Sequence, residues 1–153
     1  MSTVGPRAIN SFMICAGLLL LGSSHAATPF DLGSFRGRVV YLDFWASWCA
    51  PCRQSFPWMN HLQGELRDDG LVVIAVNVDR DHADAERFLR EHPAQFRIVY
   101  DPDGVLPEKF GVRGMPTSFL FDRNGQVQSR HEGFLLREQD ALAQQIRALV
   151  LAH

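Results

Sequence analysis

Two cysteines separated by two residues stand in the sequence Trp-Cys-Ala-Pro-Cys at positions 48–52. They follow an apolar run at 39–45 and precede a stretch with helical periodicity, so a helix N-terminus is expected at the pair. Unpaired N–H groups and the helix dipole favour a thiolate there, and such cysteines titrate at about 7 or below instead of about 8.5. The pattern predicts a redox pair in which Cys49 attacks and Cys52 resolves.

A Cys-x-x-Cys pair is also found in zinc sites and in inert structural bridges. Structural zinc takes four ligands, usually with a second pair of Cys or His at metal spacing. No cysteine follows residue 52, and the six histidines contain no H-x₃₋₅-H pair. A disulfide that closes so short a loop removes little entropy from the unfolded chain. Redox chemistry is the favoured interpretation, with metal handling and an inert bridge as the alternatives.

Length and charge narrow the class of protein. The chain has 153 residues, 46% of them hydrophobic, and a formal net charge of −2. The length and composition suit one compact domain. The charge is too small to indicate nucleic acid or a charged membrane surface as a partner, so no nucleic-acid binding is expected.

The first 26 residues have the three regions of a secretory signal peptide. Arg7 supplies the positive charge, residues 12–21 are apolar, and Ser-His-Ala at 24–26 is a small-x-small cleavage site. The apolar stretch is shorter than the roughly 20 residues of a membrane span. We expect cleavage after Ala26, a domain at 27–153 and a periplasmic location, with an uncleaved anchor as the alternative. A single close cysteine pair in an exported chain fits a redox protein better than a disulfide-stapled scaffold.

Hydrophobic periodicity predicts an α/β domain with antiparallel strands at its end. Near-continuous apolar runs indicate central strands that are covered on both faces. In the helix at 81–91, Ala83, Phe88 and Leu89 are expected to face the core. The predicted strands are 39–45, 71–78, 97–100 and a hairpin of 117–121 and 126–131, and the predicted helices are 50–67, 81–91, 105–110 and 137–151.

Three motifs at matching spacings give the chain a specific resemblance to thioredoxins. Residues 43–52 resemble the thioredoxin active-site block, and Pro57 matches the proline that kinks the following helix. The sequence Gly-Val-Arg-Gly-Met-Pro-Thr at 111–117 resembles the loop that holds the family's cis-proline, which would be Pro116. The resemblance covers nearly all of residues 27–153 and implies a thioredoxin fold with a central mixed sheet flanked by helices.

Within the superfamily the chain is most similar to the TlpA/ResA-like thiol–disulfide oxidoreductases of the bacterial periplasm. Residues 81–100 resemble the helix–strand insertion of that group, whereas the nucleophile motif of peroxiredoxins, which share the insertion, is missing. Two positions depart from the group's pattern: Asp43 stands where many members have Asn, and Ser55 where many have Glu. The segment before Val39 is also short for the group's opening hairpin.

The residues and the resemblance together assign roles in thiol–disulfide exchange. Cys49 would form a mixed disulfide with the substrate, and Cys52 would displace the product. Burial of Asp43 in an apolar strand should raise its pKa, which suits a base for Cys52; the alternative is a solvated strand-end residue.

Other residues would bind substrate or support the pair. A cis bond at Pro116 would let Met115 offer backbone groups to an extended substrate. Trp48 is expected to shield the sulfurs and contact partners. Trp45 is expected to pack beneath the site, with Pro51 as further support.

The cysteine pair would itself be the redox group, so no cofactor or metal is expected. Ala50-Pro51 resembles the dipeptides of reducing members, whereas strong oxidases carry Pro-His, which stabilises their reduced form. The resemblance implies a reductase of protein disulfides, with apocytochrome c as a candidate substrate and a membrane electron donor of the DsbD/CcdA kind. The alternatives are a disulfide-forming oxidase and a copper-handling module with Met59, His61 or Met115 as added ligands.

Overall fold

The computed structural model describes residues 1–2 and 30–152. The predicted signal peptide and its cleavage site lie outside this part of the chain, apart from the first two residues. Within the described residues, no helix combines the length and the apolar character that a membrane span requires.

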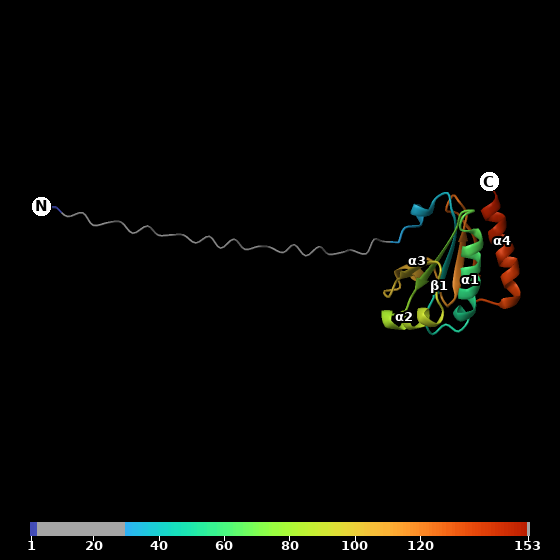
Figure 1. The fold of residues 1–153 in the computed structure, drawn as a ribbon, viewed down its shortest axis with the longest axis horizontal. Helices are drawn as coiled ribbons and strands as arrows, with labels where there is room; N and C mark the ends of the chain where they lie inside the picture. The colour runs from blue at the N-terminus through green and yellow to red at the C-terminus, as the bar shows by residue number, and fades with distance from the viewer. Residues whose placement is uncertain (3–29, 153) are drawn as a thin grey trace.

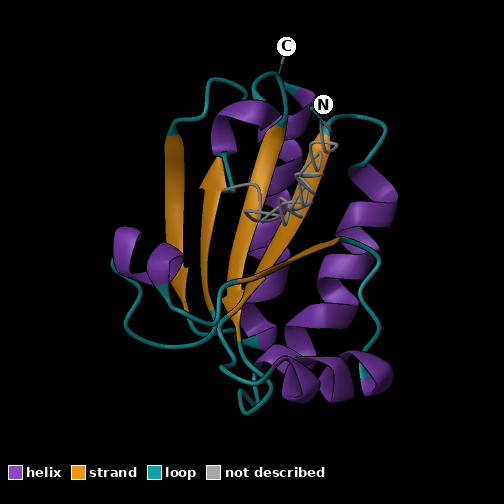
Figure 2. Cartoon of the chain, turned by 90° about the vertical axis from the view of Figure 1, so that its left-hand side faces the viewer, coloured by secondary structure: helices purple, strands orange, loops and turns teal. Residues whose placement is uncertain are grey.

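A five-stranded mixed sheet in the order β3-β2-β1-β4-β5 forms the centre of the domain (Figure 2). β1, β2 and β3 are parallel, and β4 runs antiparallel to both of its neighbours. The strands are β1 (Val39–Trp45), β2 (Leu71–Asn77), β3 (Arg97–Tyr100), β4 (Thr117–Phe121) and β5 (Val127–Glu132), and the helices are α1 (Cys52–Leu66), α2 (His82–Glu91), α3 (Val105–Lys109) and α4 (Gln139–Leu151).

Alternate residues of the central strand β1 supply two apolar layers. Side chains on one face pack with those of α1, α2 and α4, and side chains on the other face pack with those of α3 and a short 3-10 helix (Leu32–Phe35). α1 and α4 lie side by side (Figure 1), and the Arg147 guanidinium of α4 donates two hydrogen bonds of 2.8 Å to Glu65 of α1. The helix that begins at the cysteine pair is therefore fixed both to the sheet and to α4.

The predicted elements are confirmed, with shifts of a few residues at their ends. The predicted helix at 50–67 begins at Cys52, and Pro57 lies inside it. The predicted insertion forms α2 and β3, and β3 extends the parallel edge of the sheet. Residues 30–38 contain a 3-10 helix (Leu32–Phe35) and no strand.

The predicted inward orientation of Ala83 is wrong. Ala83 is exposed in the first turn of α2, whereas Ala85 and Phe88 are buried. Residues three apart share one face of a helix, so Ala85 lies on the same buried face as Phe88. The Asp81 side chain accepts a hydrogen bond from the Ala83 N–H at 2.9 Å, and this cap determines where the helix starts.

Candidate active site

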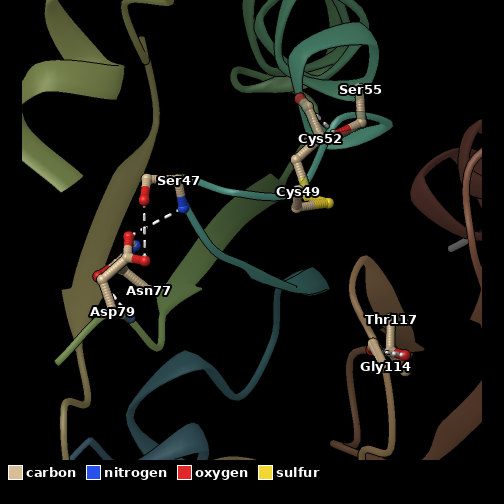
Figure 3. The surroundings of a disulfide bond; sticks show 8 residues. All are labelled: Ser47, Cys49, Cys52, Ser55, Asn77, Asp79, Gly114 and Thr117. Carbon is tan, nitrogen blue, oxygen red and sulfur yellow. Dashed lines mark hydrogen bonds between the residues drawn. A yellow bond between two sulfur atoms is a disulfide. The ribbon is translucent and has the colours of Figure 1, made fainter. Parts of the chain in front are cut away.

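Cys49 and Cys52 form a disulfide between the end of β1 and the start of α1 (Figure 3), with a Cα–Cα distance of 5.3 Å. α1 begins at Cys52, and Pro51 occupies its N-cap position. The positive end of the helix dipole therefore lies at the pair, as predicted. Cys52 is fully buried, whereas Cys49 keeps 3% of its surface exposed, so Cys49 is the outer of the two.

Asp43 is buried on the face of β1 that α1 covers. Its side chain is 2% exposed, and its Oδ2 atom has no hydrogen-bond partner among the described residues. The residues opposite it on the neighbouring strands are Ala75 and Ser118, neither of which carries a positive charge. Burial raises the pKa of Asp43 well above its usual range, as predicted, and the alternative of a solvated strand-end residue does not hold.

Two more polar side chains of β1 share this buried face. The Tyr41 hydroxyl donates a hydrogen bond of 2.8 Å to Ser118 Oγ, and burial, reinforced by the charge of Asp43, raises the pKa of Tyr41. The Nε1 atom of Trp45 has no partner among the described residues. Asp43 and its neighbours thus form a small polar region within an otherwise apolar layer.

The two tryptophans around the cysteines lie as expected. Trp45 is fully buried, and its ring centroid is 4.9 Å from that of Phe56 and 4.7 Å from that of Phe88. Trp48 is 68% exposed. Trp48 is therefore accessible beside the disulfide, whereas Trp45 packs in the core.

The Met115–Pro116 peptide bond is cis, as the motif predicts. Thr117 pairs with Phe44 of β1, which places Pro116 beside the carboxyl end of β1, where the redox loop starts. The loop is held by hydrogen bonds from Thr117 Oγ1 to the Gly114 carbonyl at 2.7 Å and from the Gly133 N–H to the Pro116 carbonyl at 2.8 Å. Figure 3 shows this turn below the disulfide.

A second buried carboxylate, Asp79, was not found from the sequence. It accepts hydrogen bonds from the Ser47 backbone N–H at 2.9 Å and from Ser47 Oγ at 3.0 Å (Figure 3). The signal in the sequence was the pair of polar residues, Asn77 and Asp79, at the end of an apolar strand.

The residues considered as copper ligands lie in different environments. Met59 is fully buried in the core, whereas His61 is exposed and lies 3.5 Å from Glu65. In the described part of the chain, no group of three or more His, Cys, Asp or Glu side chains is arranged to hold a metal ion.

Comparison with known proteins agrees with this geometry. Residues 19–146 match the Redoxin family model. The chain belongs to the Redoxin family.

Within the Redoxin family, this chain is similar to proteins named thiol-disulfide oxidoreductase ResA. It is 33% identical over 109 residues to the thiol-disulfide oxidoreductase ResA of Bacillus thuringiensis subsp. konkukian, covering 71% of this chain and 63% of the relative. It is 36% identical over 107 residues to ResA of Geobacillus thermodenitrificans, covering 70% of this chain and 62% of the relative. The match thus spans less than two thirds of the length of these relatives.

Solved structures of Redoxin-like proteins show the same fold. A Chlorobium tepidum chain, provisionally assigned as thiol:disulfide interchange protein DsbE, is 54% identical with a TM-score of 0.76, covering 78% of this chain and 84% of the other. An exposed lipoprotein thioredoxin of Streptococcus pneumoniae is 32% identical with a TM-score of 0.68, covering 78% and 91%. The predicted thioredoxin fold and TlpA/ResA-like resemblance are confirmed.

Replacing Asp43 with Asn should stabilise the oxidised Redoxin domain at neutral pH. The unfolded chain loses the Asp43 proton near pH 3.9, whereas the folded protein retains it to a higher pH, so wild-type stability falls as pH rises from about 4 towards the folded pKa. Asp43→Asn removes this loss, so its advantage should grow with pH to about 1–3 kcal/mol. Urea unfolding between pH 4 and pH 8 measures the difference.

The exposed turn residue Asp103 offers a matched control, because Asp103→Asn makes the same chemical change at the surface. If Asp43→Asn unfolds with the wild-type free energy at every pH, the burial of Asp43 is not what sets its protonation.

Proposed function

We propose that the chain is an exported thiol–disulfide oxidoreductase whose redox group is the Cys49–Cys52 pair. The observation that carries the proposal is this disulfide at the N-terminus of α1, with the cis Met115–Pro116 turn beside it. The Redoxin match and the named ResA and DsbE relatives support the reaction class. The pair stores two electrons as two thiols, so the reaction needs no other cofactor.

In the reducing direction, the Cys49 thiolate attacks one sulfur of a substrate disulfide. The substrate S–S bond breaks, one substrate thiolate leaves and a mixed disulfide forms at Cys49. Cys52 then loses its proton and attacks the Cys49 sulfur, which releases the second substrate thiolate. The substrate gains two electrons, the pair becomes the observed disulfide, and a donor must reduce it again.

We assign to Asp43 the role of base for Cys52. Cys52 is fully buried, so its proton needs an acceptor inside the domain. Asp43 lies on the sheet face under α1, and its raised pKa brings the carboxyl towards the working pH, where it can accept a proton and return it.

Protein disulfides are the proposed substrates. Trp48 is exposed beside Cys49, and the Met115–Pro116 turn lies at the end of β1, so an extended polypeptide has apolar and backbone contacts on both sides of the pair. Apocytochrome c thiols are one candidate within this class.

The compartment and the electron donor follow from the predicted signal peptide at 1–26. An exported reductase has no cytoplasmic NADPH or glutathione to draw on, so we propose a membrane donor of the DsbD/CcdA kind. The exposed location of the Streptococcus pneumoniae relative supports action outside the cytoplasm.

The two thiols should differ in reactivity in the reduced protein. Cys49 should be alkylated first by iodoacetamide at neutral pH, because Cys49 is the outer thiol at the helix start. Cys49→Ser should abolish disulfide reduction, and Cys52→Ser should trap mixed disulfides that mass spectrometry identifies. Equal labelling of both thiols would contradict these roles.

Asp43→Asn should slow the second step and spare the first. Without the carboxylate, mixed disulfide should accumulate near neutral pH, which acid quenching and gel separation detect. Ser55 lies one turn beyond Cys52, with its Oγ donating to the Cys52 carbonyl at 3.1 Å, so adding Ser55→Glu places a carboxylate near the same thiol and should restore part of the rate. Wild-type resolution by Asp43→Asn at all pH values would remove Asp43 from the mechanism.

The reduction potential of the pair should identify the direction of electron flow. Ala50-Pro51 lacks the histidine that stabilises the reduced form of strong oxidases, so equilibration with glutathione should give a value below about −180 mV. A value near −120 mV, typical of a disulfide-forming oxidase, would reverse the assignment.

A further inference from the structure

A buried carboxylate that the proposed reaction does not use lies at the base of the redox loop. Asp79 follows the end of β2 by two residues and is only 6% exposed. No ion pair among the described residues includes Asp79. A buried carboxylate without an ion pair destabilises a fold unless hydrogen bonds satisfy it. The groups that donate hydrogen bonds to Asp79 therefore indicate which part of the structure it supports.

Three donors converge on the Asp79 carboxylate. The Ser47 N–H and Asn77 Nδ2 donate to Oδ2 at 2.9 and 2.8 Å, and Ser47 Oγ donates to Oδ1 at 3.0 Å (Figure 3). In return, the Asp79 N–H donates to Asn77 Oδ1 at 3.1 Å. Both carboxylate oxygens accept in these bonds. We call Ser47, Asn77 and Asp79 the loop clamp.

The loop clamp acts on the turn that carries the attacking thiol. Ser47 lies two residues before Cys49, and the Cys49 N–H donates to the Ala46 carbonyl at 3.0 Å. Where the turn leaves β1, the Val78 N–H donates a hydrogen bond of 3.0 Å to the Trp45 carbonyl. This bond joins the carboxyl ends of β1 and β2. Hydrogen bonds therefore tie the turn to two adjacent strands of the sheet.

The middle of this turn has little side-chain packing, although Ala46 and Cys49 at its ends are buried. Trp48 is 68% exposed, and a mainly polar cleft of about 270 Å³ separates Ser47 and Trp48 from the side chains of α2. In the oxidised protein the Cys49–Cys52 bond also holds the turn, but reduction removes that bond. In the reduced protein, the loop clamp remains as a hydrogen-bonded constraint on the turn, beside the packing of the Cys49 side chain in the core.

We infer that Asp79, through Ser47, is a positioning residue that holds the Cys49 sulfur in line with the substrate disulfide. This inference rests on the proposed function, because it concerns the attack by the Cys49 thiolate. A thiolate held in the attacking geometry reacts faster than one that must first be ordered, and small displacements lower such rates strongly. Asp79 need not touch the substrate to have this effect.

Asp79→Asn tests the inference. An amide accepts hydrogen bonds more weakly than a carboxylate and has one acceptor oxygen instead of two, so the bonds from Ser47 and Asn77 weaken and the turn should loosen. Stopped-flow reaction of the reduced protein with 5,5′-dithiobis(2-nitrobenzoate) gives the attack rate across pH. At high pH Cys49 is fully ionised, so the limiting attack rate there depends on the position of the thiolate and no longer on its pKa. In Asp79→Asn this limiting rate should fall about tenfold.

The control is Asp81→Asn. Asp81 also accepts a backbone N–H, that of Ala83 at 2.9 Å, but it caps α2 instead of holding the redox loop. Asparagine also caps helices well, so Asp81→Asn makes the same chemical change outside the redox loop and should leave the limiting rate unchanged. Equal losses in Asp79→Asn and Asp81→Asn would show that the loss is not specific to the loop clamp, and a wild-type rate in a folded Asp79→Asn would overturn the inference.

Ser47→Ala keeps the N–H bond and removes only the hydroxyl bond, so it serves if Asp79→Asn does not fold. A limiting rate reduced about twofold would support the inference, and an unchanged rate would oppose it. The wild-type protein separates this test from the proposed function. If its Cys49 does not react, the oxidoreductase proposal itself fails, whereas a reactive wild type with unaffected variants removes only the clamp.

Discussion

Burial of β1 on both faces is the constraint on which the rest of the structure depends. All seven residues of the strand are buried, because β2 and β4 flank it and helices cover both sides of the sheet. A shift by one residue would turn Asp43 and Trp45 to the opposite face, so the register is strongly specified. The carboxyl end of β1 is therefore a fixed point, and the redox loop leaves the sheet from it.

The structure treats its two buried carboxylates near this point differently. Asp43 lies in a small polar region of a buried apolar layer, opposite the uncharged Ala75 and Ser118, and burial raises its pKa. Asp79 instead receives three hydrogen bonds from Ser47 and Asn77. A carboxyl without fixed partners suits proton exchange, whereas one saturated by donors suits positioning. The proposed base and the proposed positioning residue follow from this contrast.

The remaining wall of the site comes from segments distant in sequence. The pairing of Thr117 with Phe44 brings the cis Met115–Pro116 turn to the end of β1, and the N–H of Gly133, the residue that follows β5, donates a hydrogen bond to the Pro116 carbonyl. The inserted helix α2 contributes the far side of the polar cleft beside Trp48. The cysteines thus lie where the central strand, an active-site helix, an insertion and a turn before β4 meet.

Local patterns in the sequence were sufficient for the elements and for the chemical core of the site. Apolar runs marked the strands, and the spacing of Cys49 and Cys52 at a helix start indicated redox chemistry. The resemblance of residues 111–117 to the thioredoxin loop implied a cis Pro116. The burial of Asp43 also followed from its apolar neighbours along the strand. Each of these signals lies within a few residues of what it predicts.

Tertiary structure decided what depends on partners from other segments. The lack of a positive charge opposite Asp43 follows from the register with β2 and β4, and the bond between Ser47 and Asp79 spans 32 residues. The inward face of α2 was likewise set by its cap at Asp81 and by packing of Ala85 and Phe88. Periodicity along one segment carries no information about which residue of another segment will stand opposite, because that depends on how the strands pair and how the helices pack.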